Sequence, residues 1–139
     1  MTLKSADYDI PDGYQHWEGD EAEDAIGPFF FTRADGRIKT AFRAEARHCN
    51  AHESVHGGVL MTLADYTLCL GANEGSQQYV ATVSCNNEFI APAVKGNLIL
   101  GEVDVLRRGR SLVFVRCVLR VEEKVILSAS AVVKLLQQK

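Results

Sequence analysis

The amino-acid sequence predicts an α+β fold in which a mostly antiparallel sheet wraps around one long central helix. Residues 57–72 are largely apolar and carry no Lys, Arg or His, and the stretch is too long for a strand, which indicates a buried helix. Four strand-like runs follow it. In two of them, 97–107 and 111–121, apolar residues alternate with charged ones, so the sheet has a single dry face that must cover the helix.

Length and composition are those of one globular domain. The chain has 139 residues, of which 47% are hydrophobic and 24% charged, enough to bury a core without disulfides or a structural metal. Residues 1–26 are acidic and are expected to form a loosely packed arm with a short helix, followed by the main domain at 27–139. With a net charge of −3, the chain lacks the excess of basic residues that binds nucleic acid or anionic lipid, so neither is an expected partner.

The cysteines indicate a reducing compartment. None of Cys49, Cys69, Cys85 and Cys117 belongs to a C-x-x-C pair, and three of them sit in apolar segments. We therefore expect free thiols in a cytoplasmic protein, with Cys69 as a core residue and not a nucleophile. The first residues lack the apolar segment of a signal peptide, and no apolar run reaches membrane-spanning length.

The order of elements follows from local patterns. Strands are expected at 29–32 and 38–46, joined by a turn at 34–37, and residues 47–56 are expected to form a loop before the helix. The strands that follow the helix are expected at 79–91, 97–107, 111–121 and 125–136.

The hairpin between the second and third of these strands can be assigned a register. Both strands point odd-numbered residues inward, so the connection must have odd length, and Arg108-Gly109-Arg110 fits, with Gly109 available for positive φ. This register places Glu102 opposite Arg116.

Asp65 is the anomaly of the expected helix. Its neighbours along the helix are apolar or uncharged, and an ionised carboxylate in such surroundings is costly unless it is compensated. One interpretation is a general base in an active site. The other is a structural carboxylate, bonded to backbone or to Thr62, or lying on an exposed stripe. Periodicity alone leaves both open.

His56-Gly57-Gly58 stands where the helix should begin. Backbone N–H groups at a helix start are free and lie at the positive end of the dipole, so they can stabilise an oxyanion; a loop that needs glycine conformations is the alternative. Gly58 and Asp65 share one helix face but lie about 10.5 Å apart along the axis. That separation favours an interfacial site, in which one copy of the chain brings its glycines to the aspartate of another.

A competing motif overlaps this region. His52-Glu53-Ser54-Val55-His56 matches H-E-x-x-H, which binds zinc when both His lie on one helix face. Gly57-Gly58 follow directly, where that helix should continue. We therefore expect the match to be a coincidence, with no metal and no cofactor, and keep a zinc-dependent hydrolase only as an alternative.

Two further sets of charged or polar residues each allow both a functional and a purely structural interpretation. The cluster of Arg107, Arg108 and Arg110 at the hairpin tip could bind phosphate or form a solvated turn. Ser84 and Asn86 lie on a strand, where polar residues commonly face water.

The ordered set of motifs is more specific than any one of them. It comprises Gly27-Pro28-Phe29, Asn50, His56-Gly57-Gly58-Val59-Leu60, Leu63-Ala64-Asp65, Thr82-Val83-Ser84, Phe89-Ile90-Ala91-Pro92-Ala93 and Arg108-Gly109-Arg110. Over residues 27–134 the chain thereby resembles the hotdog-fold thioesterases of the phenylacetate-pathway (PaaI-like) type.

The resemblance implies a hotdog fold and an acyl-CoA thioesterase that forms a homodimer or homotetramer with interfacial sites. By position, Asp65 corresponds to the base or nucleophile, Gly57 to the group that polarises the carbonyl, and Asn50 and Ser84 to residues that position water or the thioester. His56 and Gly58 are expected to contact substrate, and Arg108, Gly109 and Arg110 to meet the CoA phosphates. A non-catalytic acyl-CoA-binding module of the same fold is the alternative. Strand parity places Ser84 on the face with Thr82 and Glu88, away from the helix, so a bulge must turn it, or it serves a neighbouring subunit, or it lies outside the site.

Overall fold

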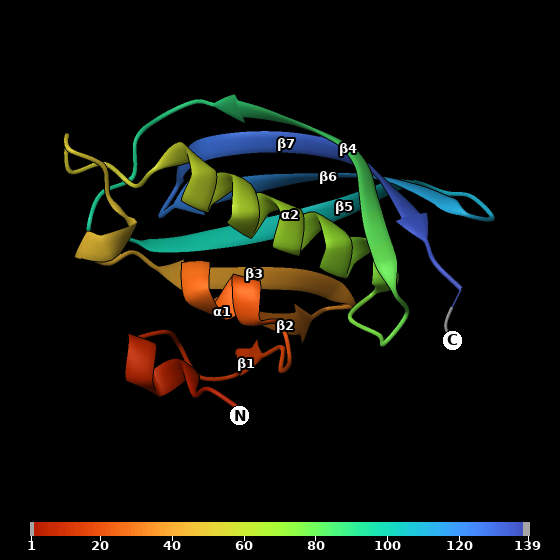
Figure 1. The fold of residues 1–139 in the computed structure, drawn as a ribbon, viewed down its shortest axis with the longest axis horizontal. Helices are drawn as coiled ribbons and strands as arrows, with labels where there is room; N and C mark the ends of the chain where they lie inside the picture. Colours follow the sequence, from red (N-terminus) through yellow and green to blue (C-terminus); the bar gives the residue numbers. More distant parts are fainter. Residues whose placement is uncertain (1, 138–139) are drawn as a thin grey trace.

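One seven-stranded sheet forms the frame of the molecule and curves around α2 (Figure 1). The structure, a computed structural model, describes residues 2–137. All strand pairs are antiparallel, in the order β1-β2-β3-β5-β6-β7-β4. The elements are η1 (Ser5–Tyr8), β1 (Gln15–His16), α1 (Glu21–Ile26), β2 (Phe30–Ala34), β3 (Arg37–Arg43), η2 (Ala46–His48), α2 (Gly57–Asn73), β4 (Val80–Phe89), β5 (Leu98–Arg108), β6 (Leu112–Val121) and β7 (Lys124–Leu135).

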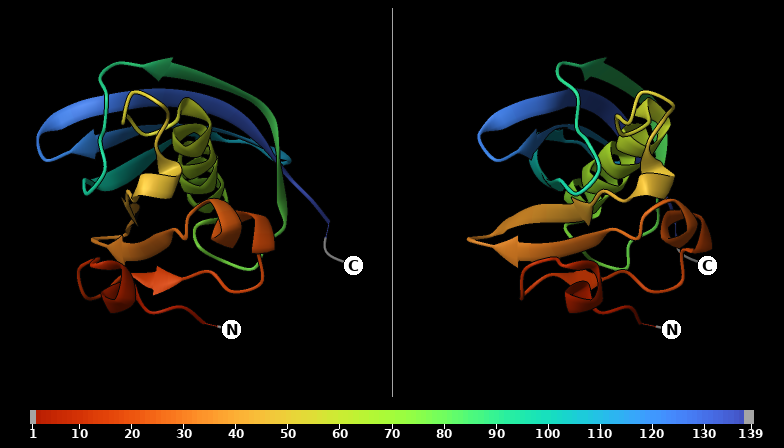
Figure 2. Two further views of the ribbon diagram at one scale, coloured as in Figure 1. Left: turned by 60° about the vertical axis from the view of Figure 1, so that its left-hand side comes forward. Right: turned by 90° about the vertical axis from the view of Figure 1, so that its left-hand side faces the viewer.

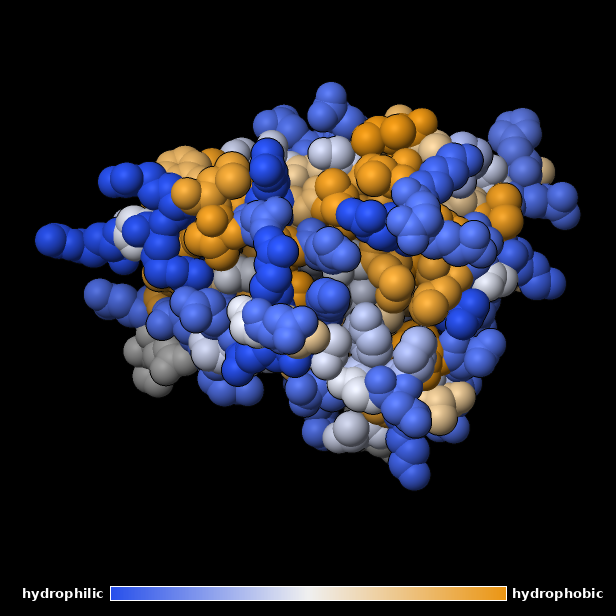
Figure 3. Space-filling view, turned by 180° about the vertical axis from the view of Figure 1, so that it is seen from behind, coloured by the Kyte–Doolittle hydropathy of each residue, from blue (hydrophilic) through white to orange (hydrophobic). Residues whose placement is uncertain are grey.

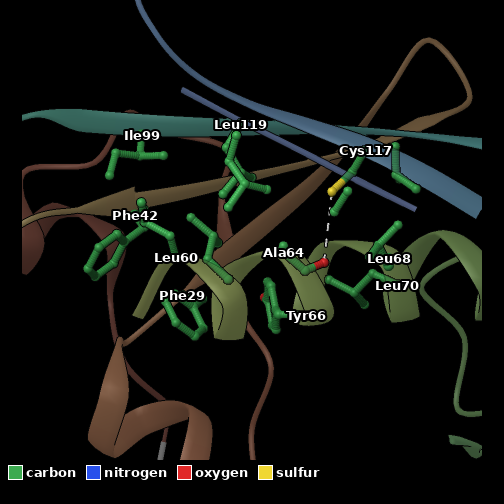
Figure 4. Close-up of a cluster of buried hydrophobic side chains, with 14 of the residues drawn as sticks. Phe29, Phe42, Leu60, Ala64, Tyr66, Leu68, Leu70, Ile99, Cys117 and Leu119 are labelled. Atoms are coloured by element: carbon green, nitrogen blue, oxygen red, sulfur yellow. Dashed lines mark hydrogen bonds between the residues drawn. The ribbon is translucent and has the colours of Figure 1, made fainter. Parts of the chain in front are cut away.

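The core lies between α2 and the concave face of the sheet (Figure 4). Leu63 and Leu68 of α2 are fully buried, as are Val113, Val115 and Leu119 of β6. The strict alternation of β6 accounts for this, because every second residue points at the helix. The expected dry face and central helix are therefore confirmed.

One stripe of α2 departs from the expectation that the helix is apolar and buried almost all round. Gly58 is exposed, Met61 is 44% exposed, and Asp65 is half-buried. These positions recur with the helical period and form a stripe that the rest of the chain does not fully cover. Asp65 thus lies on a partly open stripe, one of the positions that the periodicity had left open.

The acidic N-terminal segment is packed more closely than expected. Its β1 pairs with β2 at the edge of the sheet, and Ile10, 4% exposed, packs against Phe30 and Ala41. The expected short helix is α1, which lies against α2 (Figure 2). The segment therefore contributes one wall beside the middle of α2.

Register shifts interrupt three of the ladders, those of β4 with β7, β5 with β6 and β6 with β7. The hairpin closes with Arg108 opposite Val113, so its connection spans residues 109–112 in place of 108–110. The extra residue at Leu106 then moves the register by one, which places Glu102 opposite Val118 and Asp104 opposite Arg116. The expected pairing of Glu102 with Arg116 is wrong because the two strands join further along β6 than a three-residue connection requires. Gly109 does not adopt positive φ either; a side chain there would meet a backbone oxygen of the hairpin.

The convex face of the sheet carries hydrophobic patches among charged side chains (Figure 3). Phe114, on the outer side of β6, contributes to this surface at 37% exposure. Within the described residues, no helix is long and apolar enough to cross a membrane.

Candidate active site

Asp65 is held at the middle of α2 by residues from two directions. The hydroxyl of Thr82, on β4, donates a hydrogen bond to its Oδ1 at 2.5 Å, and the Sγ of Cys69 lies 3.8 Å from the same oxygen. Thr62, a partner considered from the sequence, instead donates to the carbonyl oxygen of Gly58 at 2.9 Å. The carboxylate is therefore positioned by side chains of α2 and β4 while its stripe of the helix stays partly open.

Cys69 lies beside Asp65 as an uncharged thiol. Burial, followed by the charge of Asp65, raises the pKa of the Cys69 thiol to about 12. Its sulfur also lies 3.3 Å from the hydroxyl of Thr82. A thiol that stays protonated is a poor nucleophile, in agreement with the sequence interpretation.

A cavity of about 450 Å³ opens beside Asp65. Its walls come from α2, from β4 and from the N-terminal segment, which contributes Trp17, Asp20 and Glu23. Burial, then the charges of Asp20, Asp65 and Asp24, raises the pKa of Glu23 to about 8. The acidic arm therefore forms part of the site, although sequence reasoning had interpreted its charges as a solvated face.

The start of α2 presents one free amide. His56 is the N-cap, and its Nδ1 accepts a hydrogen bond from the N–H of Gly58 at 2.9 Å. The N–H of Gly57 has no acceptor within the described part of the chain. A Cβ built on Gly57 would lie 3.1 Å from the ring of Phe89, so only a small residue fits without moving this ring. Of the two glycine amides, Gly57 can serve a ligand and Gly58 is already used.

Gly57 and Asp65 do not meet within one chain. They are eight residues apart on the same helix, a rise of about 12 Å. One carbonyl group cannot contact both, so a single copy presents two separated parts of a site.

Asn50 shapes the loop that leads into α2. Its Oδ1 accepts hydrogen bonds from the backbone N–H groups of His52, at 2.9 Å, and Ser54, at 3.2 Å. The H-E-x-x-H segment is consequently a turn, so His52 and His56 do not share a helix face. The described residues contain no group of three or more His, Cys, Asp or Glu placed to hold a metal ion.

A bulge at Val83 divides β4 into two parts of opposite orientation. Thr82 pairs with Val133 and Ser84 with Val132, so Val83 is the extra residue. Thr82 faces α2, and Ser84 is exposed and makes no contact with Asp65. The parity argument therefore missed Thr82, which the structure brings into the site, and Ser84 faces outward as that argument expected.

The hairpin residues lie apart from Asp65. Arg108 donates to the carbonyl oxygen of Ala72 at 2.8 Å and pairs with Glu74 at 3.2 Å, so it fastens the C-terminal end of α2. Arg110 is exposed and lines a different hollow together with Lys134. Gly109 forms the turn between the two arginines.

Comparison with known proteins defines the class. Residues 52–127, just over half of the chain, match the Thioesterase superfamily. PA0474 of Pseudomonas aeruginosa, a candidate esterase by name, is 30% identical over 127 residues, which span 88% of this chain and 95% of its own. The acyl-coenzyme A thioesterase PaaI of Escherichia coli is 27% identical over 94 residues, or 68% and 66% of the two chains. Human acyl-coenzyme A thioesterase 13 is 32% identical over 83 residues, or 58% and 59%.

Solved structures share the fold. The E. coli PaaI structure superposes with a TM-score of 0.77 at 18% identity, covering 88% of each chain. A hypothetical thioesterase of Streptococcus pneumoniae, solved with coenzyme A, superposes with a TM-score of 0.72 at 15% identity, covering 80% of this chain and 88% of that one. The chain belongs to the Thioesterase superfamily and is a thioester hydrolase of the hotdog fold. Within that class it is of the PaaI-like type.

Proposed function

We propose that this hydrolase cleaves acyl-CoA thioesters to free acid and CoA, with Asp65 as the catalytic carboxylate. One observation supports this proposal above all. Thr82 holds the carboxylate of Asp65 in the lining of a cavity of about 450 Å³, on the partly open stripe of α2. The names of E. coli PaaI and human acyl-coenzyme A thioesterase 13 support CoA as the leaving group, as does the coenzyme A in the S. pneumoniae structure.

Hydrolysis requires a nucleophile, an oxyanion site and a leaving group. In one route Asp65 takes a proton from water as the water oxygen attacks the thioester carbonyl carbon; in the other, Asp65 attacks and the resulting anhydride is hydrolysed. In both, the N–H of Gly57 stabilises the oxyanion, the C–S bond breaks, and CoA leaves as a thiolate that takes up a proton. We assign Asn50 and Ser84 to orienting water or the thioester, and His56 and Gly58 to the substrate-contacting edge of the oxyanion site.

A homo-oligomer would complete this site. The rise of about 12 Å between Gly57 and Asp65 prevents both from acting within one copy. One of the two edges of the sheet is β4, where Val83 is 60% and Phe89 54% exposed, and Met61 on α2 is also exposed. A long, apolar edge strand is a template for pairing with another chain. We propose that two copies meet there, so that Gly57 of one serves Asp65 of the other.

The substitution Asp65→Asn tests the assignment because it keeps the shape and removes the charge. If Asp65 is the base, kcat should fall by about 10²–10⁴-fold. Binding of acyl-CoA should survive, and the thermal midpoint should hold or rise. The control is Glu123→Gln, an exposed position in the turn between β6 and β7, which should leave kcat unchanged.

Two further results separate the alternatives. A stable Asp65→Asn protein with near-normal turnover would remove Asp65 from the mechanism. A single turnover in ¹⁸O-labelled water can identify the anhydride route, because label enters the Asp65 carboxylate only when water attacks the Asp65 carbonyl of an anhydride.

A further inference from the structure

The cavity beside Asp65 combines aromatic rings with carboxyl groups. Trp17, Tyr66 and Tyr79 line it together with Asp20, Glu23 and Asp65. Among the described residues that line it, none is Lys, Arg or His. This composition differs from that of a simple acyl pocket, which needs only apolar walls.

The nearby basic side chains are engaged elsewhere. His16 Nε2 lies 2.6 Å from Oδ1 of Asp24, and Arg47 donates to the carbonyl oxygen of Ala25 at 3.1 Å. Asp20 caps α1 by accepting from the N–H of Glu23 at 3.0 Å. Within the described chain, the carboxyl groups of Asp20, Glu23 and Asp65 therefore have no cationic partner.

Tyr66 adds a second, independent observation. It is 4% exposed, and its hydroxyl has no hydrogen-bond partner among the described residues. The side chain extends from α2 on the side opposite Leu119 and Cys117 and packs against Phe29, with ring centroids 5.4 Å apart (Figure 4). A buried, unpaired hydroxyl is costly, and Tyr66 is one of the residues that line the cavity.

Burial and the neighbouring carboxyl groups together set the charge state of Glu23. Asp20 and Asp24 on its own side and Asp65 on α2 all disfavour its ionised form, in addition to burial, and raise its pKa to about 8. The Cys69 thiol and the Tyr66 hydroxyl are the other titratable groups on the facing helix, and both are neutral near pH 7 because their pKa values are raised. A positive charge placed among these groups would allow Glu23 to ionise.

We propose that this cavity receives the far end of the acyl group and selects acyl groups that carry a positive charge, a quaternary ammonium group above all. This inference rests on the proposed function, since Asp65 places the thioester at one end of the same cavity. Aromatic faces and carboxylates are the combination that binds quaternary ammonium ions. An acyl group ending in a carboxylate would be repelled by Asp20 and Asp65.

Three acyl-CoA probes of similar shape test the charge preference. They are γ-trimethylammonio-butanoyl-CoA, its neutral isostere with a tert-butyl group in place of the trimethylammonium group, and glutaryl-CoA. We expect kcat/KM for the cationic probe to exceed that for its neutral isostere by about tenfold, with glutaryl-CoA the poorest. Glu23→Gln should reduce the ratio of cationic to neutral probe severalfold. Glu21→Gln, an exposed position on the same helix, should leave the ratio unchanged.

Calorimetry supplies a readout that a purely structural role of Glu23 would not move. Binding of the cationic probe at pH 7 should release a proton from Glu23, whose pKa is about 8 in the empty cavity, and the neutral isostere should release none. Equal kcat/KM for the two isosteres, equal proton release, or a preference for glutaryl-CoA would overturn the inference. If no probe is hydrolysed, the proposed function fails, and the calorimetric comparison still decides the charge preference.

Discussion

Thr82 Oγ1 and Asp65 Oδ1 lie 2.5 Å apart, and this hydrogen bond joins the edge strand β4 to the central helix. The donor arises from a strand residue that simple alternation would point away from the helix. Because β4 is an edge strand of the sheet, the orientation of the carboxylate depends on a strand whose outer side is free to pair with another chain.

Removing the hydroxyl of Thr82 should impair catalysis without unfolding the chain. Thr82→Val keeps the shape of the side chain, and the loss of a hydrogen bond to a charged group should lower kcat by about 10-fold or more. Thr82→Ser keeps the donor and should restore most of the rate. Steady-state kinetics at matched thermal stability measure the effect; equal kcat for the valine and serine variants would mean that this bond does not orient the carboxylate.

The Gly57 amide can be deleted selectively. Gly57 is the first helical residue and His56 has ψ 135°, a conformation that tolerates a following proline, so Gly57→Pro removes the N–H while the helix can still begin there. Loss of one oxyanion donor should lower kcat by about 10²–10³-fold. Gly57→Ala keeps the N–H and needs only a shift of the exposed Phe89 ring, so it should retain far more activity. Similar losses in both variants would indicate a packing effect at Phe89.

A shared site predicts complementation between two inactive variants. When Asp65→Asn and Gly57→Pro chains are co-expressed, half of randomly formed dimers are mixed, and each mixed dimer holds one intact site of two. The mixture should recover about a quarter of the wild-type specific activity. Activity no higher than that of the separate variants would show that both residues act within one copy.

The pH dependence of the free energy of unfolding should reveal the raised pKa of Glu23. Its pKa is about 8 in the folded chain against an ordinary value of 4.5. Between these values the folded chain holds a proton that the unfolded chain has released, so the free energy of unfolding falls as pH rises. Glu23→Gln removes this loss, and its melting temperature should gain on that of the wild type by several degrees between about pH 5 and pH 8. Parallel melting curves across this range, as expected for Glu21→Gln, would contradict the raised pKa.

Substitutions of the two hairpin arginines, Arg108 and Arg110, should have different effects, although the sequence suggested one role for both. Arg108→Gln should lower the melting temperature, because the side chain bonds the carbonyl oxygen of Ala72 and pairs with Glu74. Arg110→Gln should instead raise KM severalfold for acyl-CoA, with little change for a minimal thioester that lacks the nucleotide. An unchanged preference for CoA in the Arg110 variant would identify a solvated turn.

Periodic signals made most of the fold predictable. The apolar stretch at 57–72 becomes α2, and the strand-like runs become β4 to β7 within a few residues, because burial on one face leaves a regular imprint on sequence. Bulges leave no such imprint. The extra residue at Val83 hid the contact between Thr82 and Asp65, and the hairpin connection at 109–112, together with the bulge at Leu106, displaced the expected partner of Glu102.

The candidate site was predictable only where its residues stand out locally. Asp65 is conspicuous in an apolar helix, and paired glycines at a helix start are conspicuous too. Glu23 lies in an acidic run that resembles a solvated surface, and only the packing of α1 against α2 brings it to the cavity. Tertiary contact, and no local pattern, determines that part of the site.

The extra residue at Val83 lets two side chains with an odd spacing face the same side of β4. Thr82, before it, bonds Asp65 at the middle of α2, and Phe89, after it, lies against Gly57 at the start of α2. The two are seven residues apart, so a regular strand would place them on opposite surfaces. Deleting Val83 would leave a spacing of six, for which plain alternation suffices, and both contacts with α2 should survive. In length variants of this strand, the bulge and its extra residue should therefore be gained or lost together.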